Sequence, residues 1–583
     1  MGSVLSSSNN SIVPTTIPST PLTLSFHPVF SPKTHSLLMI TPSVKQAKPR
    51  VSDFQTTIDH LDKRLSPMAS RLKQFETILI MKDVTTGLEE LEDLYPSYKS
   101  LFEFSRMTKK DETILPINSL KGFHPILNAT TGVRALKTPM SWDNEIDQLI
   151  HRSSLDHKPI ISLVCGSKNL GKSSLSRHLV NRLLNNYKRV AFIETDVGQT
   201  EFTPSGMVSL HILSSPILGP PFTHQNTTPV RSFFIGSSSA QKDPAYYLEC
   251  IEELMATWKF ECNNSHTNMD DDDNDDDNDD DNSGIIPLVF NTHGWIKGLG
   301  YDLLLSITKK VQPTDVFAFY SRQNSNAHNL PPTFANSVSM ICCDTDQSPS
   351  SSPVMRHVQG TTMNGTLSDR YDASNLRALA MISYFHQTPS STLSPGQPGW
   401  DFETRLVERV PWTLDWRHLK GVWILFEEVT TRQLLYSLNG SVVGLIGDVV
   451  DYKPVESQRS VDLATQEQSL VSPAYFDSLN YPPPPPSKTT CHGLGIIRAI
   501  DPSKHALLLL TPLPLDTLKL VSGIVKGDLE LPIQCMLDEK MGSGPGICGV
   551  PWNMTPYVTT EAREGAGGDS LRVRRNLMRR GQL

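Results

Sequence analysis

The sequence predicts an α/β fold: a parallel sheet with flanking helices, preceded by an accessory domain and followed by a mainly β domain. Between residues 141 and 385, apolar strand-like runs alternate with helical patterns, which is typical of a parallel sheet. A glycine-rich loop joins the first of these strands to the first helix. After residue 400, short β-type runs alternate with turns instead.

The chain of 583 residues is long enough for three or four domains, and proline makes up about 7% of it against a typical ~5%. Some of the length is therefore expected to be tail or linker. We predict a disordered tail at 1–52, an N-terminal accessory domain at 53–154, the α/β core at 155–390 with an acidic disordered insertion at 263–284, and a C-terminal domain at 391–583.

Charge and composition exclude several classes of protein. The net charge is −8, but residues 270–281 hold ten Asp, so the remainder of the chain sums to +2 and is not strongly acidic. No apolar run approaches the ~18 residues of a transmembrane helix, and we expect no membrane partner. The eight cysteines form no C-x-x-C pair, which argues against a disulfide framework or a zinc site and favours a reducing compartment.

The tail at 1–52 contains no Asp or Glu and is rich in Ser, Thr and Pro. Such a composition predicts disorder. A transit peptide and a myristoylated N-terminus (Met1-Gly2 with Ser6) remain alternatives. Beyond the tail, residues 78–81 are expected to form a strand and residues 88–94 a helix.

In the core, the strands are expected at 160–165, 190–194, 286–291, 316–320 and 338–342. Five apolar residues share one face of a helix, which we interpret as core packing: Leu248, Ile251, Leu254, Met255 and Trp258. The Asp-rich insertion is interpreted as solvated and extended by self-repulsion. A calcium site is the alternative, but the insertion lacks the turn glycine and terminal Glu of an EF-hand loop.

The C-terminal part is expected to contain strands at 422–426, 442–449, 494–500 and 506–511. Five consecutive prolines at 482–486 predict an extended polyproline spacer.

The strongest chemical signal is G-x-x-x-x-G-K-S, which follows an apolar strand and opens a helical pattern. This context indicates a P-loop NTPase core that binds ATP. Its backbone N–H groups would surround the phosphates, the Lys172 ammonium would neutralise them, and the Ser173 hydroxyl would ligate Mg²⁺. The predicted ATP-binding residues are Gly166, Ser167, Lys168, Asn169, Leu170, Gly171, Lys172, Ser173 and Ser174.

Two carboxylates follow the next strand. Glu194 and Asp196 come 22 and 24 residues after Lys172, about one helix and one return strand, which should place Asp196 beside the P-loop at the carboxyl edge of the sheet. There it would hold Mg²⁺ or accept a proton from an attacking hydroxyl. A simple strand-end turn with solvated acids is the alternative.

A third cluster, residues 291–300 (NTHGWIKGLG), lies between a strand and a helix. Trp295 would offer a surface on which a base stacks, and Lys297 a phosphate contact. The alternative is that Trp295 packs in the core or acts in a hinge, and His293 is interpreted as structural.

Several runs together resemble the polynucleotide 5′-hydroxyl kinases, in particular the nucleolar branch that processes pre-ribosomal RNA. They are 166–173, 195–204 (TDVGQTEFTP), 291–300, 234–236 (FIG), the helix with Asn375-Leu376-Arg377 and Ser383–His386, and 573–579 (VRRNLMR). The resemblance covers residues 155–583. It implies ATP- and Mg²⁺-dependent phosphorylation of RNA 5′-hydroxyl ends in the internal transcribed spacer, a partner endonuclease, and location in the nucleus and nucleolus.

The resemblance also suggests roles for single residues. Lys172 and Asp196 would be catalytic, Ser173 and Asp196 would bind the metal, and Gln199, Trp295 and Lys297 would contact RNA. A phosphoryl-transfer site needs a mobile cation over the transferring group, and Arg370 and Arg377 are the candidates. Solvated surface arginines are the alternative for both.

Three other functions are considered. The chain would otherwise be an ATP-binding scaffold that transfers nothing, a kinase of the branch that acts in mRNA 3′-end formation and tRNA splicing, or a GTPase. No N-K-x-D guanine-reading motif is found, which disfavours the GTPase. The C-terminal tail carries a basic cluster suited to RNA, to a nuclear import receptor or to the acidic groove of a partner: Arg572, Arg574, Arg575, Arg579 and Arg580. The resemblance implies that this end docks a partner protein.

Overall fold

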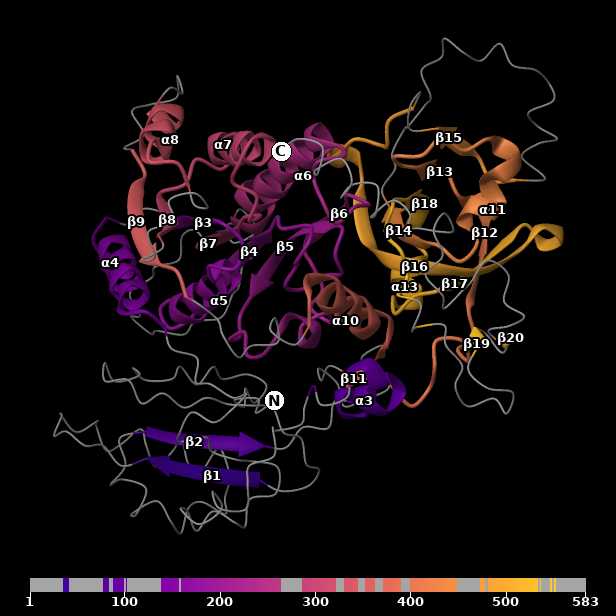
Figure 1. The fold of residues 1–583 in the computed structure, drawn as a ribbon, viewed down its shortest axis with the longest axis horizontal. Helices are drawn as coiled ribbons and strands as arrows, with labels where there is room; N and C mark the ends of the chain where they lie inside the picture. Colours follow the sequence, from indigo (N-terminus) through magenta and orange to yellow (C-terminus); the bar gives the residue numbers. More distant parts are fainter. Residues whose placement is uncertain are drawn as a thin grey trace, which may run out of the picture.

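The computed structural model describes two large sheets and the helices that cover them (Figure 1). The described residues are 35–40, 77–82, 87–98, 101, 138–156, 159–263, 286–320, 330–343, 352–361, 371–388, 399–447, 472–477, 481–532, 535, 546–547 and 550–551. Among them, no helix is both long enough and apolar enough to cross a membrane.

Within the described residues, the core sheet has seven strands in the order β6-β5-β4-β7-β3-β8-β9. Five neighbouring strands are parallel: β4 (Val190–Glu194), β7 (Leu288–Asn291), β3 (Ile161–Cys165), β8 (Asp315–Tyr320) and β9 (Val354–Gln359). Two further strands, β5 (Met207–Leu213) and β6 (Arg231–Phe234), extend the sheet in antiparallel pairing. The predicted parallel core is confirmed, and it carries an antiparallel edge.

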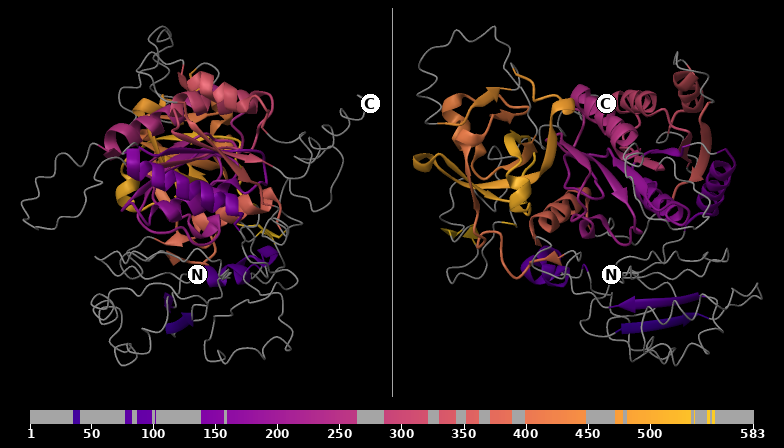
Figure 2. Two further views of the ribbon diagram at one scale, coloured as in Figure 1. Left: turned by 90° about the vertical axis from the view of Figure 1, so that its left-hand side faces the viewer. Right: turned by 180° about the vertical axis from the view of Figure 1, so that it is seen from behind.

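Helices cover both faces of this sheet, as the end-on view in Figure 2 shows. Alternate strand residues point to opposite faces, so Leu163 and Cys165 belong to one apolar cluster and Val164 to the other. The first cluster is covered by α6 (Pro244–Ala256), α7 (Leu299–Val311) and α8 (Phe334–Cys343), the second by α4 (Met140–Asp156) and α5 (Lys172–Leu183). The predicted apolar face of α6 is buried in the core, and its end continues as the π-helical turn η6 (Thr257–Cys262).

One predicted strand is wrong. Residues 338–342 lie in the helix α8, not in a strand. Phe334, Val338 and Cys342 are spaced by four, so a helix buries all three on one face against α7 and the core. The fifth parallel strand is instead β9. Its sequence, VMRHVQ, mixes apolar with polar residues, so it has no continuous apolar run like those of the other parallel strands.

A second sheet lies beyond β6 and is built of the chain after residue 400, in the order β12-β17-β16-β14-β18-β13-β15. Its strands are β12 (Trp412–Asp415), β13 (Gly421–Ile424), β14 (Val442–Gly447), β15 (Tyr475–Asp477), β16 (Thr490–Asp501), β17 (Ala506–Leu510) and β18 (Val521–Lys526). Short helices and turns lie between them: η8 (Trp416–His418), η9 (Thr431–Gln433), α11 (Leu434–Leu438), η11 (Pro486–Lys488), η12 (Pro502–Lys504) and α13 (Leu515–Leu518). The mainly β character predicted for this region is confirmed.

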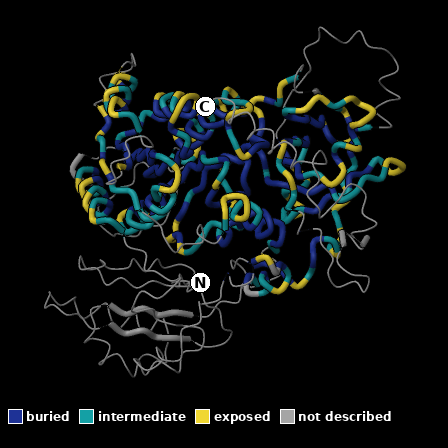
Figure 3. Tube along the Cα trace, in the orientation of Figure 1, coloured by how far each residue is buried: buried dark blue, intermediate teal, exposed yellow. Residues whose placement is uncertain are grey.

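The two sheets meet along β6 and β16, where Ser232 Oγ donates a hydrogen bond of 2.6 Å to the Cys491 carbonyl. The helix α10 (Ala373–Phe385) packs beside this junction (Figure 1), and the shared apolar cluster is buried throughout (Figure 3). Residues 87–98 contribute η2 (Leu88–Glu90), α3 (Leu91–Leu94) and η3 (Pro96–Tyr98) to the same cluster.

The remaining short strands form antiparallel pairs: β10 (Gln387–Thr388) with β11 (Gly399–Trp400), β19 (Gly546–Ile547) with β20 (Val550–Pro551), and β1 (His35–Ile40) with β2 (Thr77–Lys82). The strand and helix predicted at 78–81 and 88–94 are confirmed. At β1 the structure differs from the disorder predicted for 1–52, because the apolar run His35–Ile40 finds a partner strand. The rest of that tail, nearly all of the acidic insertion, Arg370 and the C-terminal arginines lie outside the described residues.

Candidate active site

The phosphate loop joins β3 to α5 at the carboxyl edge of the core sheet. Gly171, the last loop residue, has φ of 98°, which is left-handed backbone. A Cβ there would also lie 2.6 Å from the Thr361 hydroxyl. Both constraints require glycine, so the local conformation explains this position of the G-x-x-x-x-G-K-S pattern.

Lys172 begins α5 and its side chain is buried. Its Nζ donates a hydrogen bond of 3.0 Å to the Ser167 carbonyl, which folds the lysine over the loop. Burial lowers the pKa of Lys172, and the nearby carboxyl groups of Asp196 and Glu194 oppose that shift. A buried ammonium at a helix N-terminus is suited to attract the phosphate groups of a nucleotide.

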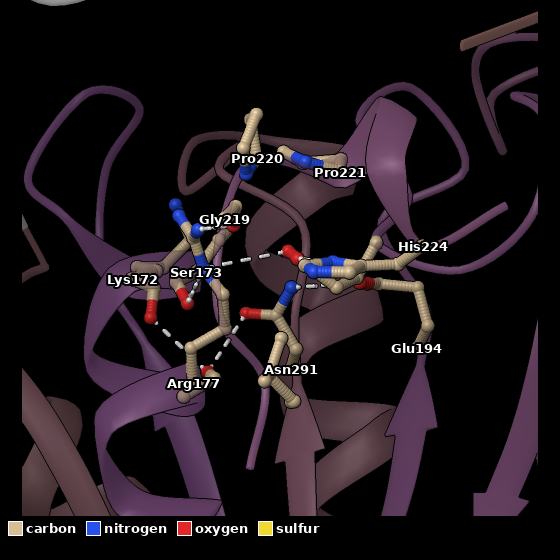
Figure 4. Close-up of polar contacts among 12 residues, drawn as sticks. Lys172, Ser173, Arg177, Glu194, Gly219, Pro220, Pro221, His224 and Asn291 are labelled. Carbon is tan, nitrogen blue, oxygen red and sulfur yellow. Dashed lines mark hydrogen bonds and ion pairs between the residues drawn. The ribbon is translucent and has the colours of Figure 1, made fainter. Parts of the chain in front are cut away.

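Glu194 ends β4 and is fully buried beside the end of β7 (Figure 4). Its two carboxyl oxygens accept hydrogen bonds of 3.0 and 3.1 Å from Asn291 Nδ2, and one also accepts from the Asp196 backbone N–H at 2.9 Å. Burial, reinforced by the charge of Asp196, raises the pKa of Glu194 well above its usual range. Glu194 is therefore placed to hold the backbone that carries Asp196.

Asp196 lies just beyond the strand and is only half-buried. Its Oδ1 accepts a hydrogen bond of 3.1 Å from the Gly198 N–H. Burial raises the pKa of Asp196, while the Lys172 ammonium opposes the shift. The strand stops at Glu194, so the two carboxylates do not share one face of an extended strand.

Asn291 is a residue that sequence reasoning quoted but gave no role. Besides binding Glu194, its Oδ1 accepts a hydrogen bond of 3.2 Å from Ser176 Oγ, one turn into α5. Asn291 thus links the phosphate-loop helix to the carboxylate strand (Figure 4). Its position at the end of a parallel strand, level with Glu194, was the available signal.

The run 291–300 lies against the phosphate loop. A Cβ on Gly294 would be 2.9 Å from Lys172 Nζ and 2.6 Å from Lys168 Cγ. His293 is buried, and burial together with the Lys172 charge lowers its pKa to about 4, which fits the structural role expected of it. Trp295 is half-buried against the core, and Lys297 is exposed.

The remaining predicted residues fall in three places. Gln199 is exposed on the loop after Asp196. Arg377 is partly exposed in α10, and within the described residues no contact joins it to the phosphate loop. Arg370 lies outside the described residues.

Sequence reasoning missed a cluster of polar side chains next to this site, in which Arg177 and His224 contact the buried Glu201 carboxylate (Figure 4 labels Arg177 and His224). Glu201 is 1% exposed. One signal could have found Arg177: it lies four residues after Ser173, on the same face of the helix.

Comparisons with known proteins place the chain among its relatives. The family described as mRNA cleavage and polyadenylation factor CLP1 P-loop matches residues 166–387, and the NOL9-like C-terminal domain matches residues 483–532. The chain is also similar to a solved wild-type Clp1p–Pcf11p complex, with a TM-score of 0.42 and 15% identity over 68% of this chain and 80% of that one.

Three curated relatives are similar over most of their length. Polynucleotide 5′-hydroxyl-kinase GRC3 of Cryptococcus neoformans is 30% identical over 96% of this chain and 71% of its own. The kinase nol9 of Dictyostelium discoideum is 27% identical over 88% and 75%, and NOL9 of Arabidopsis thaliana is 30% identical over 69% and 93%. With the phosphate loop, the carboxylates and both family matches in place, the chain belongs to the polynucleotide 5′-hydroxyl-kinase family of GRC3 and NOL9.

Proposed function

We propose that this protein transfers the γ-phosphoryl group of ATP to the 5′-hydroxyl end of an RNA. The observation that carries the proposal is the arrangement around the phosphate loop: the buried Lys172 ammonium folds over the loop, and Asp196 follows the neighbouring strand β4, near enough for each charge to influence the pKa of the other. One group is suited to the donor phosphates and the other to the acceptor hydroxyl. An ATP-binding scaffold has no need of the second.

In this reaction the RNA 5′-oxygen attacks the γ-phosphorus, and the bond from that phosphorus to the β–γ bridging oxygen breaks, so that ADP leaves. Asp196 accepts the proton of the 5′-hydroxyl, and burial raises its pKa and makes it a better base than an ordinary aspartate. Lys172 stabilises the negative charge that spreads over the transferring group. Loop residues 166–171 hold the remaining phosphate oxygens.

The donor atoms at the site suit Mg²⁺. Among the described residues, no group of three or more His, Cys, Asp or Glu could form an all-protein metal cage. Mg²⁺ bound with a nucleotide does not need one, because it keeps several waters and takes only one or two protein oxygens. The Ser173 hydroxyl would hold it, and the ion would neutralise phosphate charge. Holding the ion is the alternative to the base role for the Asp196 carboxylate.

On the acceptor side, we propose that Gln199, Trp295 and Lys297 contact the RNA. Gln199 and Lys297 are exposed on the two loops that flank the phosphate loop, and Trp295 keeps part of its surface accessible. A base stacked on such a ring gains ~1–3 kcal/mol regardless of its identity. Arg370 or Arg377 would act as the mobile cation over the transferring phosphate.

The biological setting rests on the resemblance and on the relatives named NOL9. We propose that the RNA is a spacer end in pre-ribosomal RNA, that an endonuclease partner generates that end, and that the protein works in the nucleolus. Deleting residues 570–583 should weaken co-purification with the endonuclease more than it weakens phosphorylation of a short oligonucleotide. Equal loss of both would contradict a docking role for the arginine-rich tail.

The kinase itself is tested with γ-labelled ATP or GTP, with and without a 5′-hydroxyl RNA oligonucleotide. The proposal expects label on the RNA from ATP and little nucleotide consumption without acceptor. ATP binding without any transfer would identify a scaffold, and acceptor-independent hydrolysis of GTP a GTPase. A 5′-hydroxyl DNA of the same sequence, run beside the RNA, measures the preference between the two acceptors.

A further inference from the structure

The segment between β5 and β6 runs back along α5 toward the phosphate loop. Its course is held by two side chains of the helix. Asn181 exchanges two hydrogen bonds with the backbone of Ile217, at 2.9 Å to its carbonyl and 2.7 Å from its N–H. Two residues further along the segment, Arg177 Nη1 donates a hydrogen bond of 2.7 Å to the Gly219 carbonyl. The segment therefore climbs α5 and reaches its N-terminal turn at η5 (Pro221–Thr223), as Figure 4 shows for Gly219–Pro221.

At that point the buried Glu201 carboxylate joins the helix α5 to the segment after η5. Glu201 Oε2 lies 3.6 Å from Arg177 Nε, and Glu201 Oε1 lies 3.0 Å from His224 Nδ1. Burial raises the pKa of Glu201, but Arg177 and His224 outweigh it, so the pKa lies below the usual range and the group stays charged. The Glu201 carboxylate has no role in the phosphoryl transfer proposed above.

The cluster connects two parts of the active site. Arg177 Nε also donates to the Ser173 carbonyl at 3.4 Å, in the first turn after the phosphate loop. Glu201 lies on the other side, five residues after Asp196 and two after Gln199. The segment that carries His224 is further tied to α10, because Ser383 Oγ donates a hydrogen bond to the Phe222 carbonyl.

We propose that Arg177, acting through Glu201, is a positioning residue that sets the acceptor loop (residues 196–203) against the phosphate loop. The inference rests on the proposed kinase function and names a determinant of its acceptor geometry. The planar guanidinium contacts three groups from two of its nitrogens: Nε faces the Glu201 carboxylate at 3.6 Å and the Ser173 carbonyl at 3.4 Å, while Nη1 donates to the Gly219 carbonyl at 2.7 Å. A rigid group with several donors holds the elements that it contacts at a set distance. The distance held here is the one between the donor phosphates and the base.

The rate of phosphoryl transfer depends strongly on that distance, whereas the affinity for ATP does not. A displacement of about 1 Å between reacting groups can cost ~10²-fold in rate. Loss of Arg177 should therefore lower kcat and raise KM for the RNA acceptor, while the Kd for ATP stays nearly unchanged, because the phosphate loop itself is intact.

The test compares Arg177→Gln with Arg182→Gln in the full-length chain. Arg182 is a matched control: it lies on the same helix, its side chain is 27% exposed against 26% for Arg177, and it also pairs with carboxylates, Asp143 and Asp147. We expect Arg177→Gln to reduce kcat/KM for a 5′-hydroxyl RNA by about 10²-fold. We expect Arg182→Gln to change kcat/KM less than about threefold. Both variants should lower the melting temperature by a similar amount, because each removes one arginine that pairs with carboxylates.

Two further variants separate positioning from folding. Arg177→Lys keeps the charge, but a single ammonium replaces the planar group that contacts Glu201, Ser173 and Gly219, so the variant should fold and still show an intermediate loss of kcat. Arg177→Gln combined with Glu201→Gln should be no slower than Glu201→Gln alone, because both changes break one connection. Full additivity of the two losses would overturn the inference.

The outcomes distinguish this inference from the function beneath it. An active wild-type protein in which Arg177→Gln behaves like Arg182→Gln overturns the positioning role and leaves the kinase proposal intact. A wild-type protein that binds ATP and phosphorylates no 5′-hydroxyl RNA overturns the kinase proposal and the inference with it. A selective fall in kcat with unchanged Kd for ATP supports both.

Discussion

Glu194 and Asp196 are two positions apart in the sequence, yet their carboxyl groups have different surroundings. Glu194 is enclosed and accepts three hydrogen bonds, from Asn291 and from the Asp196 backbone. Asp196 lies half-buried and interacts with the charge of Lys172. The structure thus separates a group that holds the loop from a group that is available to a substrate.

Asp196→Asn removes both the charge and the basicity at nearly constant volume. Phosphoryl transfer should fall by ~10²–10⁴-fold, the usual contribution of a positioned base, while the Kd for ATP changes much less. Glu194→Gln is the matched control and should lose much less, because burial already favours the uncharged form of that group. Quench-flow or steady-state rates with labelled ATP measure both variants. Equal rates for wild type and Asp196→Asn at saturating ATP and Mg²⁺ would exclude Asp196 from the chemistry.

The raised pKa of Asp196 also sets the pH dependence of the reaction. A base works in its deprotonated form, so the rate should fall as the pH drops through its pKa in the complex. Because burial raises that pKa above the ordinary aspartate value, the acid limb of log kcat against pH should begin at a higher pH than for a solvent-exposed aspartate. Replacing Mg²⁺ with Mn²⁺ should not restore Asp196→Asn if it acts as base, whereas a metal-holding role predicts partial recovery. An acid limb that persists unchanged in Asp196→Asn would contradict the assignment.

At the scale of elements, the edge of the core sheet depends on one buried carboxylate. Asp315, at the start of β8, is fully buried and pairs with Arg152 from α4 and with Arg356 from β9, the latter at 2.7 Å. Arg356 also reaches Glu145 of α4 at 3.1 Å. The helix α4 and the edge strand β9 are therefore attached to β8 through ion pairs.

Asp315→Asn should destabilise the protein by about 3–5 kcal/mol, because the Arg356 guanidinium stays buried with its main counter-charge removed. Asp516→Asn, which removes an exposed partner of Lys519, should cost less than about 1 kcal/mol. Urea unfolding followed by circular dichroism measures both. Equal midpoints for the two variants would show that the buried network is not what attaches these elements.

How far the sequence predicts these elements depends on what kind of pattern each one has. The strand–loop–helix at 160–184 was predictable because its apolar run, its glycines and its helical period agree. Residues 338–342 were misassigned because a short apolar run fits a strand as well as a helix, and only the packing of Phe334 against α7 decides between them. The antiparallel edge β5–β6 follows from tertiary pairing, which a local pattern does not encode.

The same limit applies to the active site. The residues of local motifs, such as Lys172 and Asp196, were predictable from spacing alone. The spacing from Ser173 places Arg177 on the site-facing side of the helix, but its contact with Glu201 was not predictable, and neither was that of His224. The two residues meet Glu201 from 24 residues before it and 23 after it, and the contact depends on a loop whose course no motif specifies.

At the scale of the whole molecule, the C-terminal sheet touches the loop that borders Asp196. The Asp528 N–H donates a hydrogen bond of 2.8 Å to the Gly236 carbonyl, and its carboxylate pairs with Lys242 at 2.5 Å. Two residues further on from Gly236, the Ser238 carbonyl lies 3.1 Å from where a Cβ of Gly198 would be. The second sheet therefore supports the acceptor side of the site.

Gly527→Ala tests this support. A Cβ at residue 527 would lie 1.9 Å from the Gly236 carbonyl oxygen, and backbone cannot yield as a side chain does. We expect a loss of stability of several kcal/mol or, in protein that still folds, a lower rate of transfer. Gly440→Ala is the control, because nothing lies within 4 Å of its Cβ and only its left-handed backbone is penalised, by about 1–2 kcal/mol. Thermal unfolding and kinase assays that fail to separate the two variants would argue against this contact as a support.

The central claim is that the phosphate loop around Lys172 phosphorylates 5′-hydroxyl ends, and one comparison tests it most directly. Wild-type protein, Lys172→Ala and Lys188→Ala, which alters an exposed lysine beyond the same helix, are incubated with γ-labelled ATP and a 5′-hydroxyl RNA. The label on the RNA should appear with wild type and Lys188→Ala and be abolished in Lys172→Ala, whose unfolding transition should stay cooperative, since the lost group acts on transition-state charge. Wild-type turnover by a folded Lys172→Ala would contradict the claim.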